Sequence, residues 1–84
     1  MRAAPIELTL MTRPGCHLCE EMKEAIVEAA RGLEIRLREV DISRNAELER
    51  EFGNDIPVLF VNGSKAFKHR AAIPELRLRL RREA

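Results

Sequence analysis

Thr12-Arg13-Pro14-Gly15-Cys16-His17-Leu18-Cys19-Glu20-Glu21 stands where an apolar run with the period of a strand meets an amphipathic helical pattern. It contains both cysteines of the chain. Two thiols separated by two residues, at a point where a strand ends and a helix begins, form an arrangement in which a thiol can become a thiolate nucleophile near neutral pH. Cys16 and Cys19 are therefore the candidate catalytic residues.

The spacing of the two cysteines predicts different roles for them. If the helix starts near Cys16, its free backbone N–H groups and the positive end of its dipole lie beside that sulfur and favour the charged form. Cys16 is then the attacking thiol. Cys19 lies one turn deeper on the same face, from which it can attack a mixed disulfide on Cys16 and release the product. Arg13 adds positive charge nearby. His17 either strengthens thiolate character or points into solvent, and the second interpretation is favoured.

Composition limits the class of protein. The 84 residues allow one domain, residues 1–84, and 45% hydrophobic with 35% charged residues is typical of a soluble globular chain. A net charge of +1 argues against a nucleic-acid binder. No run resembles a signal peptide or approaches membrane-spanning length. We therefore expect a cytoplasmic monomer that binds neither nucleic acid nor membrane. In the cytoplasm a cysteine pair is expected to be redox-active or metal-binding rather than a structural disulfide.

Hydrophobic periodicity predicts the secondary structure. Strands are expected at 6–11, 33–42, 56–61 and 64–68, and helices at 16–31, 43–52 and from Pro74 onward. Ser43 is predicted to cap the second helix, and the second strand to end in a bulge or a turn. Asn62-Gly63 is a strong hairpin signal. The expected buried side chains are Met22, Ile26, Ala29 and Ala30 in the first helix, Leu48 and Phe52 in the second, and Ile73, Leu76 and Leu80 in the third.

The order strand, helix, strand, helix, hairpin, helix belongs to an α/β protein. A right-handed crossover makes the first two strands parallel, and the hairpin completes a mixed four-stranded sheet covered by helices. The dithiol then lies at the C-terminal end of the first strand, where open α/β sheets collect their sites.

The sequence resembles the thioredoxin superfamily, and within it the small glutaredoxin-like proteins with a Cys-x-Leu-Cys site. The resemblance covers nearly the whole chain and rests on Arg13 to Cys19, Val40-Asp41-Ile42, Ile56-Pro57-Val58 and Asn62-Gly63. It implies a three-layer thioredoxin-like fold of order β-α-β-α-β-β-α. It also implies that Pro57 is cis and packs beside the thiols, and that the backbone of Ile56 pairs with bound peptide or glutathione. The candidate substrate-binding residues are Arg13, His17, Ile56 and Pro57.

The sequence departs from the glutaredoxin pattern at two places. His17 and Leu18 replace the usual Pro and Tyr between the cysteines, and the segment 67–72 lacks the Gly-Gly turn and acidic residue that grip glutathione. These departures argue against glutathione as a bound ligand. We expect no tightly bound cofactor, and glutathione stays only a candidate reductant.

Three functional hypotheses follow. The leading one is a thiol–disulfide oxidoreductase that acts on a protein or low-molecular-weight disulfide and draws on an unidentified reductant. The second is a metal or iron–sulfur carrier, since two thiolates are half of a tetrahedral zinc site, with His17 and His69 as further nitrogens. The repeated paired spacing of a zinc module is missing, so no metal ligands are assigned. The third is an interaction module that binds an acidic partner through a basic C-terminal helix with Arg70, Arg77, Arg79, Arg81 and Arg82.

Overall fold

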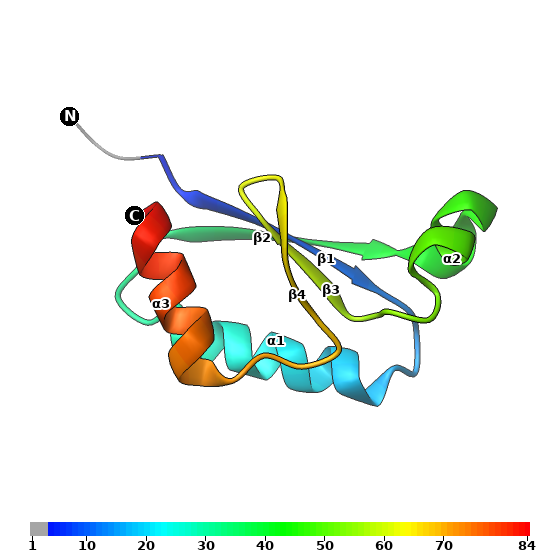
Figure 1. Cartoon of the computed structure of the whole chain (residues 1–84), viewed down its shortest axis with the longest axis horizontal. Helices are drawn as coiled ribbons and strands as arrows, with labels where there is room; N and C mark the ends of the chain where they lie inside the picture. Colours follow the sequence, from blue (N-terminus) through cyan, green and yellow to red (C-terminus); the bar gives the residue numbers. More distant parts are fainter. Residues whose placement is uncertain (1–3) are drawn as a thin grey trace.

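Strands and helices alternate along the chain before a final hairpin and helix. The computed structural model describes residues 4–84. Its elements are β1 (Ile6–Thr12), α1 (His17–Ala29), β2 (Ile35–Asp41), the 3₁₀ turn η1 (Ile42–Arg44), α2 (Ala46–Phe52), β3 (Val58–Val61), β4 (Ser64–Lys68) and α3 (Ile73–Glu83) (Figure 1). The predicted order of strands and helices is therefore confirmed.

The strands form one mixed sheet in the order β2-β1-β3-β4. β1 and β2 are parallel, whereas β3 is antiparallel to both β1 and β4. The register of β1 and β2 runs without a slip from Ile6↔Ile35 to Thr12↔Asp41. β2 therefore ends in the turn η1 rather than in a bulge, and a register shift occurs instead where β3 pairs with β4.

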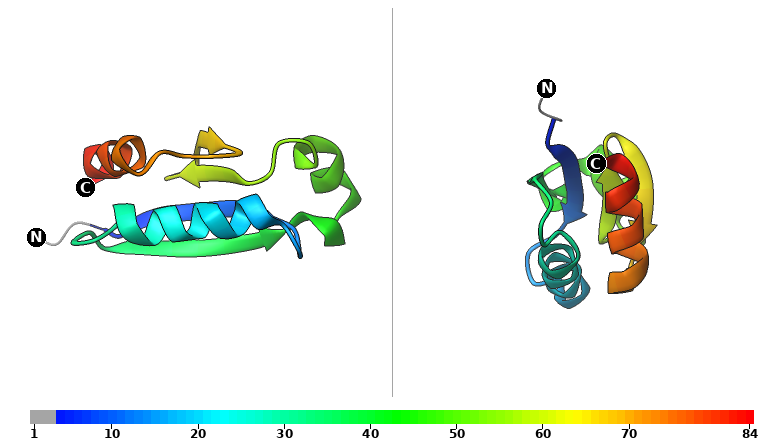
Figure 2. Two further views of the ribbon diagram at one scale, coloured as in Figure 1. Left: turned by 90° about the horizontal axis from the view of Figure 1, so that it is seen from below. Right: turned by 90° about the vertical axis from the view of Figure 1, so that its left-hand side faces the viewer.

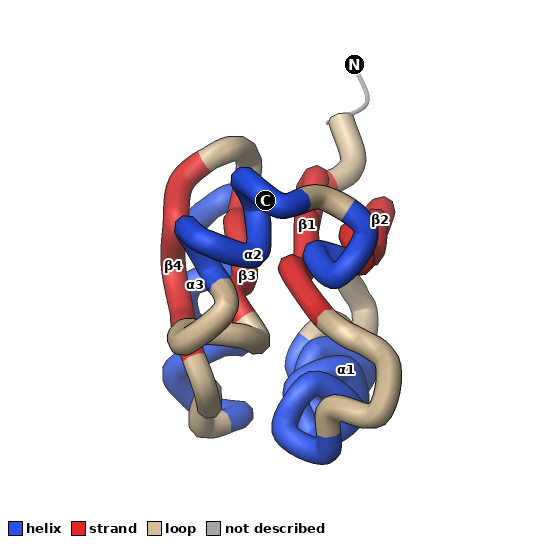
Figure 3. The backbone as a smooth tube through the Cα atoms, turned by 90° about the vertical axis from the view of Figure 1, so that its right-hand side faces the viewer, coloured by secondary structure: helices blue, strands red, loops and turns tan. Residues whose placement is uncertain are grey.

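Helices cover both faces of the sheet and give three layers. α1 and α3 lie on one face, and α2 lies at one end of the other (Figures 2 and 3). Alternate strand residues point to opposite faces and so separate two cores. The larger core lies between the sheet, α1 and α3, and its buried residues are Ile6, Leu8, Leu10, Met22, Ile26, Ala29, Ala30, Leu59, Val61, Leu76 and Leu80. The smaller core lies beside α2 and comprises Ile42, Phe52 and Val58, with Met11, Leu48, Ile56 and Phe60 packed against them.

The Asn62-Gly63 turn joins the hairpin to its surroundings. Both residues have positive φ, 48° and 84°, as a two-residue hairpin turn of type I′ requires. The side chain of Asn62 accepts a hydrogen bond from the Glu7 N–H at 2.9 Å and donates one to Glu83 at 2.8 Å. The predicted hairpin is confirmed, and its turn also contacts the start of β1 and the end of α3.

α3 is a helix, although the alternation of leucine and arginine in its sequence also has the period of a strand. Leu76 and Leu80 are fully buried, as predicted. The prediction for Ile73 is wrong, because its side chain is 38% exposed. Ile73 is the first residue of the helix, and the helix reaches the core one turn later. Within residues 4–84, no helix combines the length and the apolar composition needed to cross a membrane.

The start of α2 differs from the prediction. Asn45, not Ser43, is the N-cap, and its Oδ1 accepts hydrogen bonds from the N–H groups of Glu47 and Leu48 at 2.9 and 3.1 Å. Ser43 lies within η1, where Asp41 provides the cap. Two capping side chains follow each other here because the chain makes a separate 3₁₀ turn before the helix, and the hydrophobic pattern carries no sign of that turn.

We expect Asn45→Ala to lower the free energy of unfolding by about 1 kcal/mol, since two N–H groups of α2 lose their acceptor. Urea unfolding followed by circular dichroism measures the change. Asn45→Asp keeps an acceptor oxygen and should stay close to wild type. An equal loss in both variants would contradict the assigned cap.

A pH effect is expected at Asp41. Its pKa is lowered, first because the Ser43 hydroxyl donates a hydrogen bond to Asp41 Oδ1 at 2.6 Å. A carboxyl with a lowered folded-state pKa contributes stability above its unfolded pKa, and this contribution is lost as the pH falls through the folded pKa. Ser43→Ala should raise the native pKa of Asp41 toward its ordinary value and make this acid-dependent loss smaller.

NMR titration of the Asp41 carboxyl carbon measures that pKa directly. Ser64→Ala, at an exposed residue of the hairpin, is the control and should leave it unchanged. An unaltered Asp41 pKa in Ser43→Ala would show that the hydroxyl has no such effect.

Candidate active site

The turn that precedes α1 depends on Pro14 and Gly15. The backbone N–H of Cys16 donates to the carbonyl oxygen of Arg13 at 3.3 Å and closes a β-turn. Gly15 has a φ of 76°, which the third position of a type II turn requires, and proline is favoured at the second position. The local sequence therefore ends β1 and places Cys16 at the start of the helix.

Cys16 is the N-cap residue of α1. Its Sγ accepts a hydrogen bond from the backbone N–H of Cys19 at 3.1 Å. A sulfur in this position also meets the positive end of the helix dipole. Both interactions favour the thiolate over the thiol when Cys16 is reduced.

The two cysteines differ in exposure. They are joined by a disulfide, with their Cα atoms 5.2 Å apart. Cys16 is partly exposed, whereas Cys19 is 0% exposed and lies on the buried face of α1. Of the two cysteines, Cys16 is therefore the one that solvent reaches.

Pro57 lies at the same end of the sheet as Cys16, because β1 and β3 are antiparallel. Met11, near the end of β1, pairs with Val58 at the start of β3, and Pro57 immediately precedes Val58. The Ile56–Pro57 peptide bond is cis, as the resemblance implied, and Pro57 is fully buried.

The backbone of Ile56 is only partly open. Its N–H donates to the carbonyl oxygen of Phe52 at 3.1 Å, where α2 ends. Among residues 4–84, the Ile56 carbonyl oxygen has no hydrogen-bond donor. Of the two Ile56 backbone groups, the carbonyl is therefore the one without a hydrogen bond within the described residues.

Arg13 points toward α2, where its guanidinium forms an ion pair with Glu49. Nearby, Lys23 Nζ lies 2.7 Å from Glu20 and 3.2 Å from Glu39, and these contacts, that with Glu20 first, raise the pKa of Lys23. The cations on this side of the turn are thus already paired. They line a pocket of about 270 Å³ together with Thr12, Pro14, Gly15, Glu20, Glu39 and Asp41.

His17 projects from the first turn of α1. Its side chain is 88% exposed, and its Nε2 lies 3.1 Å from the carboxylate of Glu21. This position agrees with the favoured interpretation of His17 as a side chain that points into solvent.

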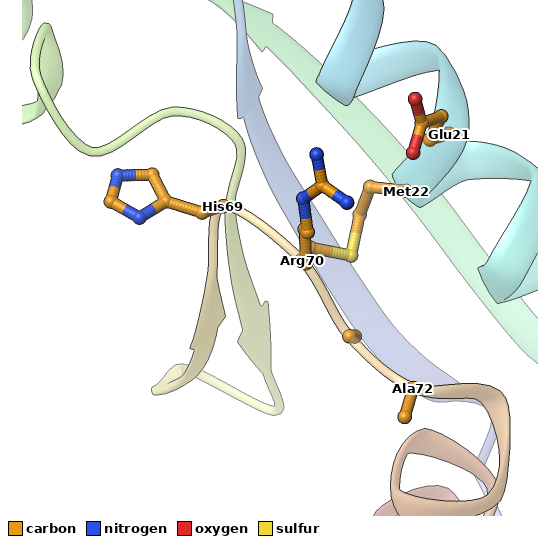
Figure 4. Close-up of a pocket in the computed structure, with 6 residues that line it drawn as sticks. Glu21, Met22, His69, Arg70 and Ala72 are labelled. Atoms are coloured by element: carbon orange, nitrogen blue, oxygen red, sulfur yellow. The ribbon is translucent and has the colours of Figure 1, made fainter.

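A second pocket, of about 340 Å³, lies between α1 and the segment that joins β4 to α3 (Figure 4). The prediction that Arg70 belongs to the basic helix is wrong, because α3 begins only at Ile73. Arg70 instead lines this pocket, which the sequence analysis missed. The hairpin signal could have located it, since the pairing of Val58 with Lys68 returns the end of β4 to the cis-proline. The lining residues are Glu21, Met22, His69, Arg70, Ala71 and Ala72.

Several residues of the alternative hypotheses have local partners. Arg77 donates to the Glu28 carbonyl oxygen at 3.2 Å, and Arg79 pairs with Glu83 at 2.6 Å. Over the described part of the chain, no group of three or more His, Cys, Asp or Glu side chains is arranged to hold a metal ion.

The mixed sheet, the disulfide at the start of α1 and the cis-proline before β3 define a protein of thioredoxin-like fold. The X-ray structure of target protein XcR50 from X. campestris is 33% identical, with 89% of this chain and 96% of that one covered and a TM-score of 0.77. The NMR structure of protein Ne2328 from Nitrosomonas europaea is 26% identical, with coverage of 95% and 96% and a TM-score of 0.80. Fasciola hepatica thioredoxin, 16% identical with a TM-score of 0.60, shares the fold.

The chain belongs to the glutaredoxin-like domain family (DUF836), whose model matches residues 7–81. A Dictyostelium discoideum protein described as "Glutaredoxin-like protein YDR286C homolog" is 35% identical over 71 residues, which cover 77% of this chain and 66% of that protein. The chain thus spans just under two thirds of that relative's length. Family membership and the Cys16-x-x-Cys19 pair together support a redox role in general terms.

In the reduced protein at neutral pH, we expect iodoacetamide to alkylate Cys16 at least about tenfold faster than Cys19, because Cys16 is accessible and its thiolate is stabilised. Mass spectrometry of peptides locates the adduct. In guanidinium chloride the two rates should become similar. Faster modification of Cys19 in the folded protein would contradict this assignment.

Proposed function

We propose that this protein is a thiol–disulfide oxidoreductase in which Cys16 is the nucleophile and Cys19 the resolving thiol. The observation that carries the proposal is the hydrogen bond from the Cys19 N–H to Cys16 Sγ at the start of α1, with Cys19 itself buried. One thiol is stabilised as a thiolate where a partner can reach it. The other is shielded and close enough to form the disulfide.

The reaction takes two exchange steps. The Cys16 thiolate attacks one sulfur of a substrate disulfide, forms a mixed disulfide and expels the other substrate sulfur as a thiolate. Cys19, deprotonated, then attacks Cys16 Sγ, so that the Cys16–Cys19 disulfide forms and the second substrate thiolate leaves. The substrate gains two electrons, and the protein loses two. A thiol reductant restores the dithiol by the same steps in reverse.

The substrate is expected to bind beside the cis-proline. The open carbonyl of Ile56 can accept a backbone N–H from an extended peptide, and buried Pro57 holds that carbonyl in place. Arg13 and His17 border the same region but contact Glu49 and Glu21. We therefore assign backbone recognition to Ile56, a positioning role to Pro57, and a secondary role to Arg13 and His17.

Electrons come, in this proposal, from a soluble thiol in the cytoplasm rather than from a bound cofactor. The substrates are protein disulfides or low-molecular-weight disulfides, and the protein acts as a monomer. Glutathione is one reductant to test, although the segment 67–72 differs from the glutathione-gripping turn of glutaredoxins.

We expect Cys19→Ser to accumulate a mixed disulfide on Cys16 when it is mixed with a disulfide-bonded peptide, because the resolving step is missing. Cys16→Ser should form no such adduct and should lower the reduction rate to that of the uncatalysed reaction. Intact-mass spectrometry detects the adduct, and circular dichroism confirms that both variants are folded. Reduction at the wild-type rate by Cys16→Ser would refute the mechanism.

A further inference from the structure

The pocket between α1 and the β4–α3 segment adjoins the redox site through both of its walls. On one wall, Met22 follows Cys19 by one turn on the buried face of α1. On the other, the backbone N–H of His69 donates to the Pro57 carbonyl oxygen at 2.8 Å. The walls of the pocket therefore continue into the segments that carry Cys19 and Pro57.

Arg70 reaches into this pocket from the segment before α3, and Figure 4 shows its guanidinium directed toward α1, beside the side chain of Met22. Within residues 4–84, Arg70 has no ion-pair or side-chain hydrogen-bond partner. A guanidinium carries five N–H donors in a planar fork that matches a carboxylate. All of these donors are free for a ligand.

The other polar groups around the site are already engaged. The guanidinium of Arg13 pairs with Glu49, and the imidazole of His69 contacts the Asn54 carbonyl oxygen at 3.1 Å. Glu21, on the wall opposite Arg70, lies 3.1 Å from His17. Arg70 is therefore a lining cation that is exposed to solvent and has no protein partner among residues 4–84, and the ligand it fits is an anion.

We propose that this pocket receives an acidic side chain of a protein substrate, and that Arg70 selects disulfides with an Asp or Glu near the reacting cysteine. The inference rests on the proposed function and deepens it by naming the substrate class. A protein segment is favoured over a small molecule because the open Ile56 carbonyl offers an extended backbone an anchor beside the pocket. The bidentate, charge-assisted pair between Arg70 and the carboxylate gives the preference.

The test uses two disulfide-bonded peptides that differ only in Glu or Gln beside the cysteine. For wild type, kcat/KM should be about fivefold higher for the Glu peptide, the effect of a favourable, partly exposed ion pair. Arg70→Gln should bring the ratio of the two peptides to about one. Arg81→Gln removes the same charge from an exposed residue near the end of α3 and should keep the wild-type ratio. Added salt should reduce the wild-type ratio.

Several results would overturn the inference. One is a Glu-to-Gln peptide ratio of kcat/KM that stays near its wild-type value in Arg70→Gln. Another is a ratio that falls equally in Arg81→Gln, which would show that the preference comes from the overall charge of the protein. Glutathione disulfide, measured in parallel, is a small-molecule disulfide that also carries carboxylates. If Arg70→Gln lowered kcat/KM for glutathione disulfide but not for the Glu peptide, the assignment to protein substrates would be overturned.

The ratio of kcat/KM for the two peptides tests this inference separately from the proposed function. It compares two substrates of the same variant, so a general loss of activity in that variant does not change it. Equal reduction of both peptides by wild type contradicts the role of Arg70 and leaves the oxidoreductase intact. If wild type reduces neither peptide and Cys19→Ser forms no mixed disulfide with either, both the function and the inference fail.

Discussion

The backbone N–H of Cys19 and the sulfur of Cys16 lie 3.1 Å apart at the start of α1, and this contact requires a sharp change from strand to helix. The turn through Pro14 and Gly15 makes that change possible. The same helix places Cys19 on its buried face, within reach of a disulfide with Cys16. Two chemically identical side chains thus acquire different environments from a few residues of backbone.

The sheet brings the remaining parts of the site to this helix. Because β3 is antiparallel to β1, the cis-proline lies at the end of the sheet where β1 stops. Because β4 is antiparallel to β3, its last residues return to the same end and place Arg70 beside α1. The ion pair between Arg13 and Glu49 links the turn before Cys16 to α2 on the opposite face. Segments far apart in sequence therefore lie at the same end of the sheet as the partly exposed Cys16.

Much of this arrangement could be predicted because it depends on local signals. The residues at the strand-to-helix change before Cys16 and at the Asn62-Gly63 turn favour those conformations locally. Asn45 was missed as a cap because a 3₁₀ turn intervenes before α2, and the hydrophobic period that predicts the helix gives no sign of that turn. Arg70 was assigned to a helix because its neighbours are basic, whereas its position depends on where β4 ends. The partner of Arg13 lies on an element that only tertiary packing brings near.

A titration of the purified protein in glutathione buffers of graded reduction potential would examine the Cys16–Cys19 couple itself. Thiol counting and intact-mass spectrometry follow the oxidation state at each potential. The account predicts a single reversible transition in which the disulfide gains two electrons and two protons, with the same midpoint from either direction. A disulfide that does not form again under oxidising conditions, or a protein that ends only as a stable glutathione adduct, would contradict it.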